Sequence, residues 1–168
     1  MLRACYQLFL RSGLAWSWLA IGVLAVDQYT KWWVQHHLVW LTPYPVLPFL
    51  NLTLVYNKGA AFSFLHSASG WQNGLLGGLS VVVSIVIVGW LSVLRSNARS
   101  ESIALNLILA GACGNVLDRL SDGYVIDFLD FHWYAWHFAI FNVADSAICV
   151  GTILLIWRWG MTLSPSSS

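Results

Sequence analysis

Apolar residues gather in four long segments of the chain, and the length of these segments predicts helices that cross a membrane. A helix needs about 20 largely apolar residues to span the hydrocarbon core of a bilayer. Four segments meet this requirement: residues 12–34, 74–94, 102–120 and 141–159. The pattern therefore predicts a mainly α-helical membrane protein, with four transmembrane helices in a single domain that covers residues 1–168.

The connection between the first two segments lacks the polarity of an ordinary loop. Residues 49–55 alternate between polar and apolar side chains, which is the pattern of a half-buried strand, and residues 57–59 offer a turn. Residues 128–141 are rich in aromatic side chains and can supply further strands. We expect these apolar connections to form a surface that rests on the bilayer or grips an extended peptide.

Composition excludes several classes of protein. Of the 168 residues, 58% are hydrophobic and 9% are charged, whereas an average soluble domain is about 25% charged, so this chain cannot cover a globular surface. The net charge is +1 and no basic run occurs, which excludes a nucleic-acid-binding stripe. The three cysteines form no CxxC motif, so we expect neither a disulfide framework nor a zinc site.

The basic residues predict the orientation of the chain in the membrane. Five arginines lie at the termini or between the second and third segments: Arg3, Arg11, Arg95, Arg99 and Arg158. Lys31, Lys58 and Arg119 lie at the opposite ends of the segments. Since cytoplasmic loops carry the excess of Lys and Arg, we expect a multi-pass protein with both termini in the cytoplasm.

Three pairs of polar residues lie at helical spacing, at the predicted extracytoplasmic ends of their segments. Members of a pair are three or four residues apart, so they share one face of a helix. The pairs are Asp27 with Lys31, Asn115 with Arg119, and Asn142 with Asp145. A polar cluster near the membrane surface suits hydrolysis, because water must reach it, better than ion transport, whose sites usually lie near the bilayer midplane.

Asp127 and Asp145 are the candidates for the chemistry. Carboxylates are costly beside hydrocarbon, so acidic residues in or near a span indicate a functional site. Two neighbouring carboxylates in a low dielectric tend to share one proton. One can then deprotonate a water while the other protonates the scissile carbonyl oxygen or the leaving nitrogen. The pair predicts an aspartyl hydrolase, although spacing alone leaves Asp118 open as a member.

Other chemistries have less support. The serines lie in no serine-hydrolase motif, HExxH is absent, Glu101 is the only glutamate, and the five histidines match no ligand spacing, so we expect no metal. A transporter with a proton relay through Asp27, Asp127 and Asp145 would need an inverted repeat or broken helices at the midplane. Neither is visible in the sequence.

Five motifs occur in the order and spacing of one known family. They are VDQYTK (residues 26–31), NKGAAFS (57–63), GNVLDR (114–119), GYVIDF (123–128) and FNVADS (141–146). Together they resemble the motifs of lipoprotein signal peptidase, the signal peptidase II family, over essentially the whole chain apart from the termini. One such motif would be a weak signal, but five in order, combined with four apolar segments, are specific.

The resemblance implies an aspartyl endopeptidase of the bacterial inner membrane. Such an enzyme removes the signal peptide from diacylglyceryl-modified prolipoproteins by cutting before the lipidated cysteine. The implied fold has four transmembrane helices and a small extracytoplasmic β-sheet, with the active site on the periplasmic side. The implied partners are lipidated prolipoproteins and membrane lipid, without metal or other cofactor, and we expect a monomer.

The resemblance also implies roles for single residues. The catalytic pair of the family falls on Asp127 and Asp145. The residues placed around the substrate or in support of the pair are Asn57, Gly59, Asn115, Arg119, Asn142, Asp27 and Lys31. The pair of Asp27 and Lys31 can equally be a structural ion pair at the end of a helix.

The remaining aspartates receive structural interpretations. We expect Asp118 to be a structural residue whose charge is held by Arg119 or by nearby backbone. Asp122 and Asp130 lie in predicted loops, where we expect them to be solvated.

The predicted topology can be tested by cysteine labelling in a variant without the native cysteines. We expect a cysteine introduced as Asn97→Cys to be protected in intact cells from a membrane-impermeant thiol reagent, because position 97 lies in the basic connection between the second and third segments. Lys58→Cys is the matched control and should react from outside. Reaction at position 97 from outside would reverse the orientation.

Overall fold

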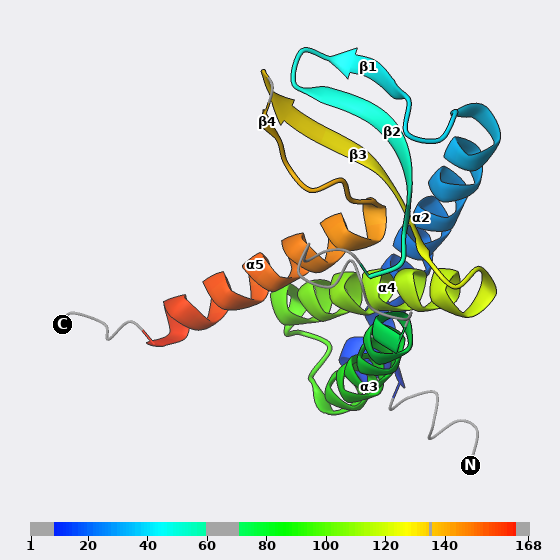
Figure 1. Cartoon of the computed structure of the whole chain (residues 1–168). Coiled ribbons are helices and arrows are strands. Elements are labelled where there is room, and N and C mark those ends of the chain that lie inside the picture. Colours follow the sequence, from blue (N-terminus) through cyan, green and yellow to red (C-terminus); the bar gives the residue numbers. More distant parts are fainter. Residues whose placement is uncertain (1–8, 60–70, 135, 164–168) are drawn as a thin grey trace.

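The computed structural model describes residues 9–59, 71–134 and 136–163 of the chain. Arg3, Cys5 and residues 60–63 of the second motif lie outside this range. Within it the protein is mainly helical, with a small antiparallel sheet. Figure 1 shows the sheet at one end of the molecule, beyond the helices that carry it.

Each of the four predicted segments overlaps with one long helix. These helices are α2 (Ser17–His37), α3 (Trp71–Val93), α4 (Arg99–Ser121) and α5 (Val143–Leu163). A short 3-10 helix, η1 (Gly13–Trp16), precedes α2. Among the described residues, three helical stretches are long and apolar enough to cross a membrane, namely α3, α4 and Val143–Met161 of α5. Helix α2 is not among them, and its second half carries Asp27, Gln28, Lys31, Gln35, His36 and His37.

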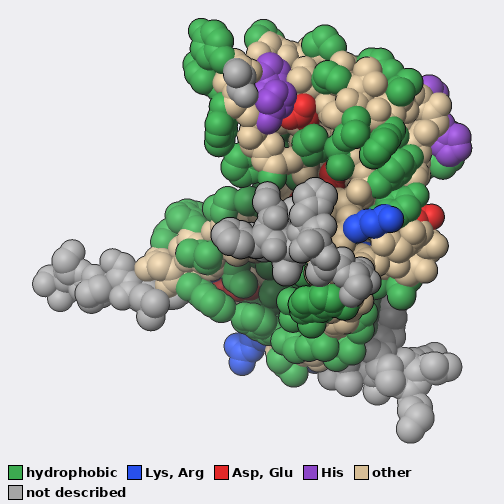
Figure 2. All heavy atoms as spheres, viewed as in Figure 1, with side chains coloured by type: hydrophobic (Ala, Val, Ile, Leu, Met, Phe, Trp, Pro, Cys, Tyr) green, Lys and Arg blue, Asp and Glu red, His purple; other side chains and the backbone are tan. Residues whose placement is uncertain are grey.

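Helix α4 is the centre of the helical part. It packs against α2, α3 and α5. Half of the residues in its apolar membrane-spanning stretch are buried, compared with 11% in α3 and 22% in α5. Ile87 and Leu91 of α3 and Leu105 of α4 form a buried apolar cluster. Most apolar side chains of α3 and α5 instead point outward, and Figure 2 shows hydrophobic side chains over the helices and the sheet, with only isolated charges.

Glycines allow α4 and α5 to approach until their backbones nearly touch. A Cβ atom added to Gly111 of α4 would collide with the carbonyl oxygen of Ala144 in α5. A Cβ added to Gly151 of α5 would lie 2.6 Å from the carbonyl oxygen of Ala104 in α4. Helices in membranes associate through such small residues, because lipid is as apolar as a leucine side chain and close packing has to provide the attraction.

The sheet has four strands in the order β1-β2-β3-β4, and all neighbours are antiparallel. The strands are β1 (Pro43–Leu47), β2 (Leu50–Asn57), β3 (Val125–Trp133) and β4 (Trp136–His137). The predicted strand at residues 49–55 is therefore confirmed as β2, and the aromatic stretch supplies β4 and part of β3. Val34 of α2 packs with Leu54, Ile126 and Phe128 of the sheet in a buried cluster.

A turn before β3 and a β-bridge after it hold the middle of β3 against the start of α5. Gly123 follows the last turn of α4 with φ of 76°, a left-handed conformation that glycine adopts without steric cost, and the chain turns there into β3. After β4, Phe141 forms an isolated bridge with Leu129 of β3. The bridge contains the bonds Leu129 N–H to Phe141 O (2.8 Å) and Phe141 N–H to Leu129 O (3.2 Å). The middle of β3 and the N-terminus of α5 therefore lie side by side.

Close packing of α4 on α5 predicts that Gly111→Ala destabilises the protein. The added Cβ forces the two backbones apart, and overpacking of this kind costs roughly 1–3 kcal/mol. The measurement is the free energy of unfolding in detergent. Gly89→Ala in α3 is the control, because a Cβ there meets no atom within 4 Å. Equal stability of Gly111→Ala and the wild type would contradict this account of the interface.

Candidate active site

Asp127 lies in β3 with 2% of its surface exposed. Its Oδ2 accepts a hydrogen bond of 2.9 Å from the side-chain amide of Asn57, at the end of β2. That amide is itself held, because Asn57 Oδ1 accepts from the backbone N–H of Gly59 at 2.9 Å. Gly59 has a φ of 104°, a backbone conformation that residues other than glycine rarely adopt. The Asn-Lys-Gly turn therefore points the Asn57 amide at Asp127.

Asp145 lies in the first turn of α5, where it forms a reciprocal cap with Asn142. Its backbone N–H donates to Asn142 Oδ1 at 2.9 Å, and its own Oδ2 accepts from the backbone N–H of Asn142 at 3.3 Å. This is the geometry of a capping box, in which two N–H groups that the helix leaves unpaired are satisfied. The other oxygen, Oδ1, accepts from the Asn115 side chain at 2.7 Å. Both oxygens of Asp145 are therefore oriented by the protein.

Asn142 connects the two carboxylates. Its side chain is fully buried, and its Nδ2 donates to Asp127 Oδ1 at 2.7 Å. The same Nδ2 lies 3.2 Å from the Ile126 carbonyl oxygen and 3.3 Å from Asn115 Oδ1. One residue thus caps the helix of Asp145 and binds the carboxylate of Asp127.

The surroundings of the two carboxylates differ. Burial raises the pKa of Asp127 to about 7, and the charge of nearby Asp145 acts in the same direction. The amides of Asn57 and Asn142 and the ammonium of Lys31 act against this rise. Asp145 is more exposed than Asp127, and it sits at a helix N-terminus, which favours negative charge. The pKa of Asp127 therefore lies near neutral pH, whereas Asp145 has the more exposed position at the end of a helix.

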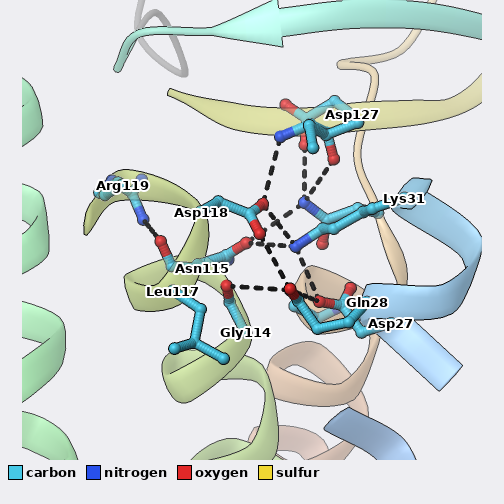
Figure 3. A network of polar contacts seen from close by, with 12 residues as sticks. Asp27, Gln28, Lys31, Gly114, Asn115, Leu117, Asp118, Arg119 and Asp127 are labelled. Carbon is cyan, nitrogen blue, oxygen red and sulfur yellow. Dashed lines mark hydrogen bonds and ion pairs between the residues drawn. The ribbon is translucent and has the colours of Figure 1, made fainter. Parts of the chain in front are cut away.

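A buried ionic group adjoins this pair. Lys31 of α2 contacts Asp27 Oδ2 and Asp118 Oδ2, both at 2.8 Å, and donates to Asn115 Oδ1 at 3.3 Å. Figure 3 shows Lys31 between Asp27 and Asp118, with Asp127 on the strand above. Asp27 and Lys31 form the ion pair that their spacing predicts. The Asp118 side chain pairs with Lys31 and not with Arg119, so the expectation of an Arg119 partner is wrong. The alternative expectation of a backbone partner is correct, since the Ile126 N–H donates to Asp118.

Arg119 lies in the last turn of α4, on the side that faces α3. Its Nη1 donates to the backbone carbonyl of Asn115 at 3.0 Å, and its Nε is buried without a partner among the described residues. It borders a groove of about 230 Å³ between α3 and α4 that is also lined by Asn73 and Gly77. Arg119 therefore has a free donor near the pair, although it binds neither carboxylate directly in the described part of the chain.

The structure corrects the prediction for Asp130 and adds Gln28, which the sequence analysis missed. Asp130 was expected to be solvated but is only 3% exposed. Burial opposes its ionisation, but bonds from His137 and Thr53 outweigh that effect and lower the pKa of Asp130. Gln28 was also missed, although a polar residue in an apolar segment is a usable signal, and it bonds to Asp118 at 2.9 Å. Asp122 is exposed, as expected.

Metal ligation has no visible basis in the described ranges. No group of three or more His, Cys, Asp or Glu side chains there is arranged to hold a metal ion. The free cysteines Cys113 and Cys149 lie in α4 and α5. Where β3 meets α5, the described residues place two carboxylates among amide, ammonium and guanidinium groups.

The chain is similar to known proteins of one family. Residues 19–161 match the family model for signal peptidase (SPase) II. A lipoprotein signal peptidase of Coxiella burnetii is 51% identical over 90% of this chain and 92% of its own length. A lipoprotein signal peptidase of Acinetobacter baylyi is 49% identical over 88% of this chain and 83% of its own.

Two solved structures of bacterial membrane enzymes share the fold. One has a TM-score of 0.81 and 29% sequence identity, and the match covers 94% of this chain and 95% of the other. The second has a TM-score of 0.79 and 30% identity, with 93% and 97% covered.

Proposed function

The chain belongs to the signal peptidase II family, whose members remove signal peptides from prolipoproteins, and we propose that it does so as an aspartyl endopeptidase with Asp127 and Asp145 as the catalytic pair. The observation that carries this proposal is the double role of Asn142, which caps the helix of Asp145 and binds the carboxylate of Asp127. Asn57, Asn115 and Lys31 complete the set of groups around the two carboxylates.

The two aspartates divide the work of acid and base. Asp145, the more exposed of the two, takes a proton from a water molecule as the water oxygen attacks the carbonyl carbon of the scissile peptide bond. Asp127, which still carries a proton in about half of the molecules near neutral pH because burial raises its pKa to about 7, donates that proton to the carbonyl oxygen. The resulting diol collapses as Asp127 takes back the proton of one diol hydroxyl, the C–N bond breaks, and the proton on Asp145 passes to the leaving nitrogen.

The apolar surface fits a substrate that arrives from lipid. The pair lies where the sheet meets the outer ends of α4 and α5, and the surrounding helices expose apolar side chains. We propose that α2 is a fourth membrane span, that the chain lies in the inner membrane as a monomeric single domain, and that the pair faces the periplasm. The substrate is then the prolipoprotein whose diacylglyceryl-modified cysteine follows the cleaved bond.

Substitution of the two aspartates tests the catalytic assignment. We expect Asp127→Asn and Asp145→Asn each to abolish cleavage of a lipidated prolipoprotein while leaving membrane levels normal, because asparagine keeps the volume but cannot act as an acid or base. Asp118→Asn is the comparison: it should cleave more slowly than the wild type but remain active per folded molecule in detergent. A dead but well-folded Asp118→Asn beside an active Asp127→Asn would move the pair to Asp118 and Asp145.

Substrate selectivity tests the biological role. The purified protein should cleave a diacylglyceryl-modified prolipoprotein and leave its unlipidated precursor intact, since the lipid places the scissile bond at the membrane surface where the pair lies. The measurement is release of the signal peptide from each form at equal concentration. Equal cleavage of both forms would assign the enzyme to a different class of precursor.

The raised pKa of Asp127 predicts the pH dependence of catalysis. Since the acid must be protonated, kcat/KM should fall as pH rises through about 7, and the fall should be about tenfold per pH unit well above that value. Asn57→Ala is the informative comparison, because it removes a donor that favours the ionised form and should move the alkaline limb to higher pH. An unchanged limb in that variant would show that Asp127 does not set it.

A further inference from the structure

Two backbone N–H groups next to the proposed catalytic aspartates are held by carboxylates from other helices. Ala144, which precedes Asp145, donates to Asp27 Oδ1 at 2.8 Å. Ile126, which precedes Asp127, donates to Asp118 Oδ2 at 3.3 Å. Each catalytic aspartate is thus attached, through the residue before it, to one acidic side chain beneath the site.

The two holding carboxylates are joined to each other. Lys31 Nζ lies 2.8 Å from both Asp27 and Asp118, and none of these three residues is more than 2% exposed. Gln28 is a second bridge, since its Nε2 donates to Asp118 at 2.9 Å and to Asp27 at 3.2 Å. Figure 3 shows this connection between α2 and α4, with β3 above it.

We propose that Asp27, Lys31 and Asp118 form a positioning clamp that fixes the separation and relative orientation of Asp127 and Asp145. The inference rests on the proposed function, because it assumes that these two aspartates are the catalytic pair. The clamp residues are positioning residues that act through the backbone of α5 and β3. They do not have to touch the substrate.

A third connection of the clamp reaches a catalytic carboxylate through a side chain. Lys31 Nζ contacts Asn115 Oδ1 at 3.3 Å, while Asn115 Nδ2 donates to Asp145 Oδ1 at 2.7 Å. The positive charge of Lys31 favours an orientation of the Asn115 amide in which its carbonyl oxygen faces Lys31. The NH2 group of that amide is therefore turned toward Asp145.

Stability alone does not account for this group. Burying two carboxylates with one ammonium removes three charges from water, and well-packed apolar residues in place of buried ion pairs are often equally or more stabilising. The backbone also makes room for the clamp, because a Cβ on Gly114 would lie 2.5 Å from Asp27 Oδ2. What apolar residues could not provide is an acceptor for the N–H groups of Ala144 and Ile126.

The test measures kcat and KM per folded molecule for Asp27→Asn and Asp118→Asn. A misplacement of about 1 Å at a reacting pair can cost on the order of 100-fold in rate, so we expect kcat to fall by about 10- to 100-fold with KM little changed. Glu101→Gln is the matched control, because it also removes an ion pair on α4, with Arg158 at 3.1 Å, but at the end of the helix away from the site. Its kcat should remain that of the wild type.

The double variant Asp27→Asn/Asp118→Asn separates a clamp from two independent supports. Once one of the two carboxylates is replaced, the other alone no longer sets the separation of Asp127 and Asp145. The kcat of the double variant should therefore be only slightly lower than that of the less active single variant. Contacting residues of one network show such non-additivity. Losses that multiply would overturn the clamp.

Gln28→Leu keeps the proposal testable if the charge variants do not fold. It removes one bridge without leaving a charge unpaired, and we expect kcat to fall by about 3- to 10-fold, the size of one hydrogen bond. Wild-type kcat in Gln28→Leu, or in a folded Asp27→Asn, overturns the clamp. Failure of the catalytic assignment is distinguishable, since it would appear as cleavage by Asp127→Asn or Asp145→Asn.

Discussion

The close packing of α4 on α5 is the contact on which the rest of the site depends. Without side chains at Gly111 and Gly114, the N-terminus of α5 lies directly against α4 and within reach of α2. Asn115 can then bond to Asp145, and Asp27 can accept the N–H of Ala144. A bulkier interface would separate these groups by more than the length of a hydrogen bond.

The N-terminus of α5 has backbone N–H groups that require hydrogen-bond acceptors, and nearby polar residues provide them. A helix that begins near hydrocarbon leaves several N–H groups without partners, and water does not reliably satisfy them there. Asn142, Asp145 and Asp27 satisfy three such groups at the start of α5. The same residues carry or adjoin the proposed chemistry, so capping and catalytic geometry are built from one set of bonds.

The sheet contributes the second carboxylate and its different environment. β3 places Asp127 opposite Val55 of β2, the strand that also carries Asn57, and the bridge between Leu129 and Phe141 brings the start of α5 alongside. Burial then raises the pKa of Asp127 to about 7, while Asp145 remains more exposed at the end of a helix. Two identical side chains can therefore serve as acid and base, because the fold surrounds them differently.

The sequence by itself determined the long helices, strand β2 and the polar residues that the structure brings together, because apolar length, alternation and motif order are local properties of the chain. It did not predict β1, since Pro43 and Pro45 argue against a strand and are tolerated only because β1 is an edge strand. It also placed Asp130 in solvent and left Asp118 beside Arg119. Only the tertiary structure decided that Asp118 pairs with Lys31, that Asp130 is buried, and that Asn142 serves both carboxylates, because each of these bonds joins elements whose proximity depends on how the helices and the sheet pack.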